Sequence, residues 1–132
     1  MSNQLKIFVF LFVCINISFA QESRMGNAER RYCKAYFLAE KYKLLEDYDS
    51  AEKKYKECIE INDNDPAAFF ELAKIFWLRA DISTAKNYAL KAVELDQKNK
   101  WYHYFLVQLY RYQFDYESEA ETWENLILIV DD

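Results

Sequence analysis

The chain has 132 residues, which suits one small domain or a part of a larger protein. Hydrophobic residues make up 52% of the chain and aromatic residues 18%, which favours a core rich in aromatic rings. The chain contains one Gly and one Pro, too few for a β fold with tight turns, so an all-helical fold is favoured. The formal net charge is −5 and no basic run is present, so we do not expect nucleic acid as a partner.

Residues 1–20 have the pattern of a signal peptide. A single charged residue, Lys6, precedes the apolar run Ile7–Phe19. The small residues Ser18 and Ala20 stand at the two positions that a signal peptidase reads. We therefore expect cleavage near Ala20 and an exported mature chain, either periplasmic or secreted and associated with the cell envelope.

Two other interpretations of this segment are weaker. A membrane anchor needs about 20 apolar residues, whereas residues 7–20 are shorter and include Asn16 and Ser18. A lipoprotein signal would use Cys14, but Val13 stands before it where a small residue is required. The sequence thus predicts no membrane span in the mature chain.

A 34-residue period begins after the signal. Residues 21–31 are polar, contain Gly26 and are expected to form a linker. Three repeats follow, at 32–65, 66–99 and 100–132. Each has apolar residues at three- and four-residue steps in two segments, positions 1–14 and 17–30, which predicts two amphipathic helices per repeat.

Equivalent positions of the repeats hold equivalent residues. Position 7 is Leu, position 8 is small or Val, position 11 is aromatic and position 16 is Asp: Leu38, Leu72, Leu106; Ala39, Ala73, Val107; Tyr42, Phe76, Tyr110; Asp47, Asp81, Asp115. Position 20 is Ala51 and Ala85, but in the third repeat the small residue moves to Ala120 at position 21. The Asp residues can cap the second helices, and Asp65–Pro66 marks the start of a first helix.

This register resembles the tetratricopeptide repeat (TPR) family, whose unit is a 34-residue helix-turn-helix. The resemblance runs from Tyr32 to Asp132 and rests on three units in one register. Matching residues are Leu38, Ala39, Tyr42, Tyr48, Ala51, Tyr55 and Cys58, then Phe69, Leu72, Ala73, Phe76, Ala85, Ala92 and Leu95, then Leu106, Tyr110, Tyr116 and Trp123. It implies an all-α fold, a right-handed α-solenoid of three TPR hairpins after the signal peptide, without a cofactor.

The resemblance also implies a function. In the family the first helices line a concave groove that binds a polypeptide segment. The groove candidates here are large rings with interspersed cations, which are typical of binding hot spots: Tyr36, Phe70, Lys74, Trp77, Trp101, Tyr104, Arg111 and Tyr112. A protein or peptide with apolar and acidic side chains would suit them, as in an assembly scaffold of the cell envelope.

Some chaperone-binding members of the family carry a Lys/Asn/Arg clamp for a C-terminal carboxylate. The corresponding positions in this chain are Tyr36, Glu40, Glu71, Trp101 and Phe105, which do not support that specificity. Sugar or small-ligand binding in the aromatic groove stays open as an alternative.

Enzyme chemistry and a metal site are not expected. The acidic residues are mostly spread beside Lys, and no Gly-rich loop or Cys–His pair is present. The single histidine, His103, stands at position 4, where the family prefers an aromatic residue, and is interpreted as a half-buried substitute for one. Cys33 and Cys58 would lie near the same end of one hairpin, so a disulfide is conceivable, although their helix faces are expected to differ.

The last repeat ends in an apolar helix, TWENLILIVDD. Solenoids need a polar terminal helix, and Trp123, Leu126, Ile127 and Val130 would leave an apolar face open. One expectation is that the chain is an N-terminal fragment of a longer repeat protein. The alternative is self-association through this face as an assembly subunit.

Overall fold

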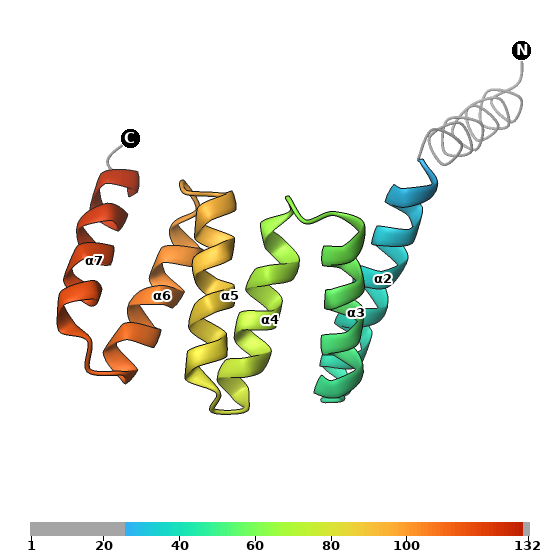
Figure 1. Cartoon of the computed structure of the whole chain (residues 1–132), viewed down its shortest axis with the longest axis horizontal. Coiled ribbons are helices and arrows are strands. Elements are labelled where there is room, and N and C mark those ends of the chain that lie inside the picture. The colour runs from blue at the N-terminus through green and yellow to red at the C-terminus, as the bar shows by residue number, and fades with distance from the viewer. Residues whose placement is uncertain (1–25, 131–132) are drawn as a thin grey trace, which may run out of the picture. The chain divides into compact units, whose positions relative to one another are not determined.

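The computed structural model describes residues 26–130, in which the secondary structure consists of six helices (Figure 1). They are α2 (Asn27–Leu44), α3 (Tyr48–Ile61), α4 (Pro66–Leu78), α5 (Ile82–Leu95), α6 (Lys100–Tyr112) and α7 (Tyr116–Val130). Residues from Tyr32 onward form one compact unit. Within that unit the helices pair as hairpins α2–α3, α4–α5 and α6–α7, which confirms the predicted helical solenoid of three repeats.

The predicted helix caps are present. Asp47 and Asp81 each accept a hydrogen bond at 3.1 Å from the backbone N–H three residues later, and Asp115 does so at 3.2 Å. Asp65 caps α4 through the N–H of Ala67 at 2.9 Å, directly before Pro66. Each cap satisfies a backbone donor that has no partner inside its helix, so these residues define where the helices begin.

The turns inside the three hairpins share one backbone conformation. Position 15 is Glu46, Ala80 and Phe114, with φ of 59°, 59° and 58°. The N–H of the following Asp bonds back over five residues at 3.0 Å in every repeat, which is the closure of a Schellman motif. The left-handed residue ends each first helix without a glycine, at a modest steric cost.

Helix α2 begins upstream of the first repeat. It starts at Asn27, so residues 27–31 of the predicted linker are helical, while the compact unit itself starts at Tyr32, the predicted start of the first repeat. The carbonyl of Gly26 accepts from Arg30 N at 3.0 Å, and the Arg30 guanidinium donates to Asn27 Oδ1 at 2.9 Å. Residues 28–31 are good helix formers, so the helix extends upstream of the repeat.

The signal-peptide prediction and the rest of the linker fall on residues 1–25, outside the described part of the chain. Among the described helices, none is both long enough and apolar enough to cross a membrane.

Small residues hold the hairpins together, as the sequence predicts. Ala39 and Ala51 of the first repeat and Ala73 and Ala85 of the second are fully buried, so the helix backbones approach closely there. Three core clusters of the described residues join neighbouring repeats. The first contains Ala35, Ala39, Ala51, Tyr55, Cys58, Ala68, Leu72 and Ile75; the second contains Ala73, Ala85, Ala89, Leu106 and Leu109; the third contains Phe69, Ala92 and Tyr102.

Candidate functional site

The eight groove candidates lie on the first helices of the repeats, α2, α4 and α6. Half-buried side chains are Tyr36, Phe70, Lys74 and Trp77, whereas exposed ones are Trp101, Tyr104, Arg111 and Tyr112. Their exposure therefore rises along the chain toward the third repeat. The surroundings of the half-buried and the exposed members differ in kind.

A charged cluster of Glu40, Lys43, Glu71 and Lys74 lies between α2 and α4. Glu71 is only 9% exposed, yet its two carboxylate oxygens accept from Lys43 Nζ at 2.6 Å and Lys74 Nζ at 2.5 Å. Lys43 Nζ also donates to Glu40 at 2.8 Å, and the Tyr55 hydroxyl donates a hydrogen bond to the same Glu40 oxygen. The cluster thus contains two positive and two negative groups and is neutral as a whole.

The pKa values in the cluster follow from this pairing. Burial alone would raise the pKa of Glu40, but hydrogen bonds from Lys43 and Tyr55 hold it below its ordinary value. Burial would lower the pKa of Lys43, but its bonds to Glu40 and Glu71 raise it. Burial, followed by the hydrogen bond to Glu40, raises the pKa of Tyr55 far above its usual range. Glu40, Lys43 and Tyr55 therefore keep their ordinary charge states near neutral pH.

An aromatic cluster of Phe70, Trp77, Tyr102, Phe105 and Tyr112 lies between α4 and α6. Ring centroids are 4.6 Å apart for Phe70–Tyr102 and 5.5 Å for Phe70–Phe105. Trp77 meets Phe105 at 6.1 Å and Tyr112 at 5.3 Å, both edge to face. These separations fall in the range in which ring pairs attract each other beyond area burial. Three groove candidates, Phe70, Trp77 and Tyr112, are therefore partly used in packing neighbouring repeats.

Three groove candidates with aromatic rings, all on α6, stay open to solvent. Trp101 is 65% exposed, Tyr104 47% and Tyr112 58%. The adjacent cation, Arg111, donates to Glu119 at 2.8 and 2.6 Å. Lys74 is likewise bound to Glu71, so both candidate cations already have a carboxylate partner within the chain.

Position 6 of the first helix is a contributor that the sequence-based groove set leaves out. It holds Phe37, Glu71 and Phe105, and each follows a groove candidate at position 5. Glu71 organises the charged cluster and Phe105 the aromatic one. The sequence spacing could have identified this position, because position 6 lies three residues before position 9 on the same helix face.

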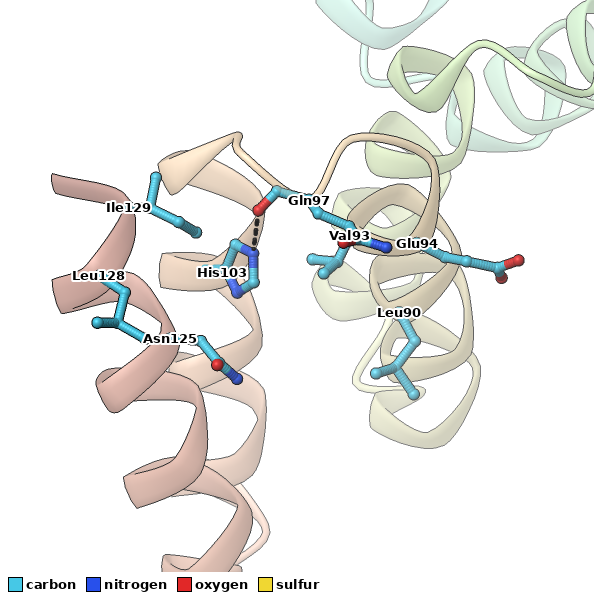
Figure 2. Close-up of a pocket in the computed structure, with 8 residues that line it drawn as sticks. All are labelled: Leu90, Val93, Glu94, Gln97, His103, Asn125, Leu128 and Ile129. Atoms are coloured by element: carbon cyan, nitrogen blue, oxygen red, sulfur yellow. Dashed lines mark hydrogen bonds between the residues drawn. The ribbon is translucent and has the colours of Figure 1, made fainter. Parts of the chain in front are cut away.

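A separate pocket of about 470 Å³ lies beside α6, between α5 and α7 (Figure 2). His103 lies between the two walls, and its Nε2 is 2.9 Å from the carbonyl oxygen of Gln97 (Figure 2). Its Nδ1 has no hydrogen-bond partner among the described residues. The ring is 6% exposed, so it is more buried than the sequence suggests, and residues 26–130 contain no group of three metal-ligating side chains.

The predicted open face of α7 needs one correction. Trp123, Leu126, Ile127 and Val130 together line a hollow of about 230 Å³. Leu126, however, is only 7% exposed, because position 27 points into the hairpin as Cys58 does in the first repeat. Ile127 and Val130 remain 57% and 63% exposed, so the open part of the face is narrower than expected.

The two cysteines of the described region are free. Cys33 is exposed, whereas Cys58 is buried with its Sγ 3.9 Å from the carbonyl oxygen of Tyr32. Burial raises the pKa of the Cys58 thiol to about 11, so it stays protonated at neutral pH. The residues occupy different helix faces, and no disulfide joins them.

Comparison with solved structures decides the fold. The TPR2B domain of yeast Sti1 in complex with pHsp70 superposes with a TM-score of 0.70 over 76% of this chain and 80% of that chain, at 19% identity. The chain has the tetratricopeptide-repeat fold. The first TPR of Spaghetti (RPAP3), bound to the HSP90 peptide SRMEEVD, matches this chain at a TM-score of 0.68 over 76% of it and 81% of that chain, at 14% identity.

A longer TPR-like neighbour is MamA from Desulfovibrio magneticus RS-1, with a TM-score of 0.70 and 17% identity. This match covers 76% of the chain but only 56% of the matched chain, which is MamA from residue 41 to its end. No family model matches the chain, and no curated protein matches it in sequence. The likeness to these TPR structures is therefore one of fold.

Proposed function

We propose that this TPR protein is a non-enzymatic interaction module that binds a polypeptide segment along α2, α4 and α6. The observation that carries the proposal is the set of solvent-exposed rings on one helix, Trp101, Tyr104 and Tyr112, beside the half-buried Trp77. Large rings with few rotatable bonds bury much area at low entropic cost, which is why they dominate binding hot spots. Two structural neighbours, Sti1 TPR2B and the first TPR of RPAP3, are themselves complexes with pHsp70 and an HSP90 peptide.

The chemistry of the surface favours an apolar segment over an acidic one. Lys74 and Arg111 are bound to Glu71 and Glu119, so an acidic ligand would have to compete with carboxylates already in place. Glu40 and Glu71 are paired with Lys43 and Lys74, so the charged cluster on α2 and α4 is neutral as a whole. We therefore propose a ligand with aromatic or aliphatic side chains and little negative charge, rather than one like SRMEEVD.

The proposed setting is the cell envelope, where the module would act as an assembly scaffold after export. Support comes from the sequence of residues 1–20, with its apolar run and its small residues before the expected cleavage site. A fusion of this segment to a reporter enzyme that is active only after export tests the proposal. Retention of the reporter in the cytoplasm would contradict it.

Binding is tested with a library of immobilised 15-residue peptides, followed by calorimetry on the strongest binder. Loss of two exposed rings in Trp101→Ala/Tyr112→Ala should weaken binding at least about tenfold, since hot-spot rings each contribute more than about 1 kcal/mol. The matched control is Leu90→Ala, an exposed residue on α5 away from this surface.

Three outcomes would count against the proposal. Equal loss in the control would mean that the rings are not the contact. No binder from the whole library would contradict polypeptide recognition in this groove. Displacement of the peptide by free sugars at millimolar concentration would instead favour the small-ligand alternative.

A further inference from the structure

The two junctions between repeats show how a first helix docks on the preceding hairpin. Ala68 and Ile75, at positions 3 and 10 of α4, are fully buried in one cluster with Ala51, the position 20 residue of the first repeat. At the second junction, Leu109 at position 10 of α6 is buried in one cluster with Ala85, again position 20. Positions 3 and 10 thus form the docking side of a first helix, and position 20 belongs to the surface that receives it.

The same docking side of α2 is open, and we call it the head face: Lys34, Phe37, Lys41, Leu44 and Leu45. Positions 3 and 10 here are Lys34 and Lys41, both exposed. Phe37 is 71% exposed, Leu44 81% and Leu45 66%. Together with Glu40, four of these side chains line a hollow of about 310 Å³. The head face therefore combines a large apolar surface with two lysines.

The receiving surface of the last hairpin is partly open, and we call it the tail face: Glu119, Trp123, Leu126, Ile127 and Val130. Ile127 and Val130 are exposed, whereas Leu126 is 7% and the Glu119 side chain 13% exposed. Its position 20 is Glu119, where the other repeats have Ala. The small Ala120 that follows is exposed and does not replace it. Helix α7 carries four glutamates and no lysine or arginine. The tail face therefore combines an apolar hollow with acidic side chains.

We propose that the head face of one copy of this chain docks on the tail face of a second copy, as α4 docks on the first hairpin. In that register Lys41 takes the place of Ile75, and Glu119 takes the place of Ala51. Ala51 and Ile75 belong to one apolar cluster inside the chain, whereas Lys41 and Glu119 carry opposite charges. Glu119 is bound by Arg111 within its own chain, so Lys41 of the second copy would be an additional partner of this carboxylate. Phe37 and Leu44 then cover the exposed apolar side chains of α7.

Charge complementarity decides between this arrangement and the two-fold alternative. Pairing α7 with α7 of a second copy would bring two sets of four glutamates together without a lysine or arginine on either helix, which is repulsive. Head-to-tail docking places lysines opposite glutamates. Because such a contact is heterologous, it repeats from copy to copy and gives a ring or an open filament. This inference concerns the ends of the solenoid and does not depend on ligand binding by its first helices.

The test is light scattering behind size exclusion on the purified chain over a hundredfold concentration range. We expect oligomers that grow with concentration beyond a dimer. Phe37→Glu on the head face and Ile127→Glu on the tail face should each abolish this growth. Both side chains are exposed, so the fold should persist, as checked by circular dichroism. Leu90→Glu on α5 is the matched control and should assemble as the unmodified chain does.

Mixing the two defective variants gives the sharpest outcome. Each retains one intact face, so the mixture should form 1:1 dimers and nothing larger. A monomer at all concentrations of the unmodified chain, or a dimer that survives Phe37→Glu, would overturn the proposal. So would a mixture that stays monomeric.

A charge exchange tests the register. Lys41→Glu and Glu119→Lys alone should each weaken association about tenfold, which corresponds to about 1.4 kcal/mol. Both changes in one chain reverse the pair, so opposite charges face each other again and most of the affinity should return. Additive loss in the double variant would show that these two residues do not meet and would overturn the proposed register.

Discussion

The two junctions between repeats occupy the same register but differ in chemistry at position 6. At the first junction this position is Glu71, which binds Lys43 and Lys74. At the second it is Phe105, which packs against Phe70 and Trp77. The backbone arrangement therefore tolerates either a neutral set of ion pairs or a set of rings at one site. What the junctions share is the fully buried aliphatic residue at position 10.

This difference predicts different responses to solution conditions. The ion pairs of Glu71 are only partly buried, with the Lys43 and Lys74 side chains 24% and 37% exposed. Salt and acid therefore weaken them, whereas ring packing is not affected. The stability of the first junction should therefore depend on salt and pH more than that of the second. Four changes test this view, in order of decreasing effect.

The largest effect should come from the shared aliphatic position. Ile75→Ala and Leu109→Ala each remove a fully buried side chain and leave a cavity, so each should lower the free energy of unfolding by about 2–5 kcal/mol. Urea denaturation followed by circular dichroism measures both. The control, Leu78→Ala, is 60% exposed and should change stability far less. A large gap between the two buried variants would mean that the junctions are not equivalent even in their apolar part.

Next comes the position that differs. Glu71→Gln removes a nearly buried charge and leaves Lys43 and Lys74 without it, which should cost about 1–3 kcal/mol. Its counterpart Phe105→Leu keeps an apolar side chain and should cost about 1 kcal/mol or less. Unfolding in 0.05 and 0.5 M NaCl separates the causes, because salt should lower the stability of the unmodified chain more than that of Glu71→Gln, which loses the pairs of Glu71 and keeps those of Glu40 and Arg79 at this junction. Equal salt dependence in all three proteins would remove the proposed distinction.

Acid should act on the first junction. The pKa values of Glu40 and Glu52 lie below their ordinary value of about 4.5 in the folded chain. The unfolded chain therefore binds more protons, so stability falls as the pH drops from about 4.5 through the folded-state pKa values. Denaturation midpoints between pH 6 and pH 3 record this loss, and Glu40→Gln should reduce its slope. A slope unchanged in Glu40→Gln would assign the acid sensitivity to other carboxyls.

The smallest effect should come from the ion pairs at the outer edge of the first junction. Arg79 donates to Asp49 at 2.5 Å and also binds Glu52, but the Asp49 side chain is 87% exposed. Arg79→Ala should cost no more than about 1 kcal/mol, since exposed ion pairs contribute little. Thermal unfolding measures this change. A loss comparable with that of Ile75→Ala would show that Arg79 also supports the packing of Phe76, over which its guanidinium lies.

Much of the fold follows from the 34-residue period. The predicted second helices at positions 17–30 correspond to Tyr48–Ile61 and Ile82–Leu95, because Asp caps mark their starts. The repeat pattern does not indicate that α2 extends upstream to Asn27, since the helix-forming residues 28–31 lie outside that pattern. The sequence assigns the groove residues to one side of their helices, but it does not identify the residues that they contact. The Lys43–Glu71 bond joins residues 28 apart and depends on side-chain conformations across a junction.

The uneven burial of the helices has a consequence for local opening. Six residues of α4 are buried, against two in α7, Thr122 and Leu126. In a linear array each hairpin is supported only by its neighbours, so the terminal helix should fray at the lowest free-energy cost. Amide protons of α7 should then exchange with deuterium well before those of α4. Since α7 also carries the tail face, any molecule that docks there should slow this exchange, which makes the amide protons of α7 a direct reporter of occupancy.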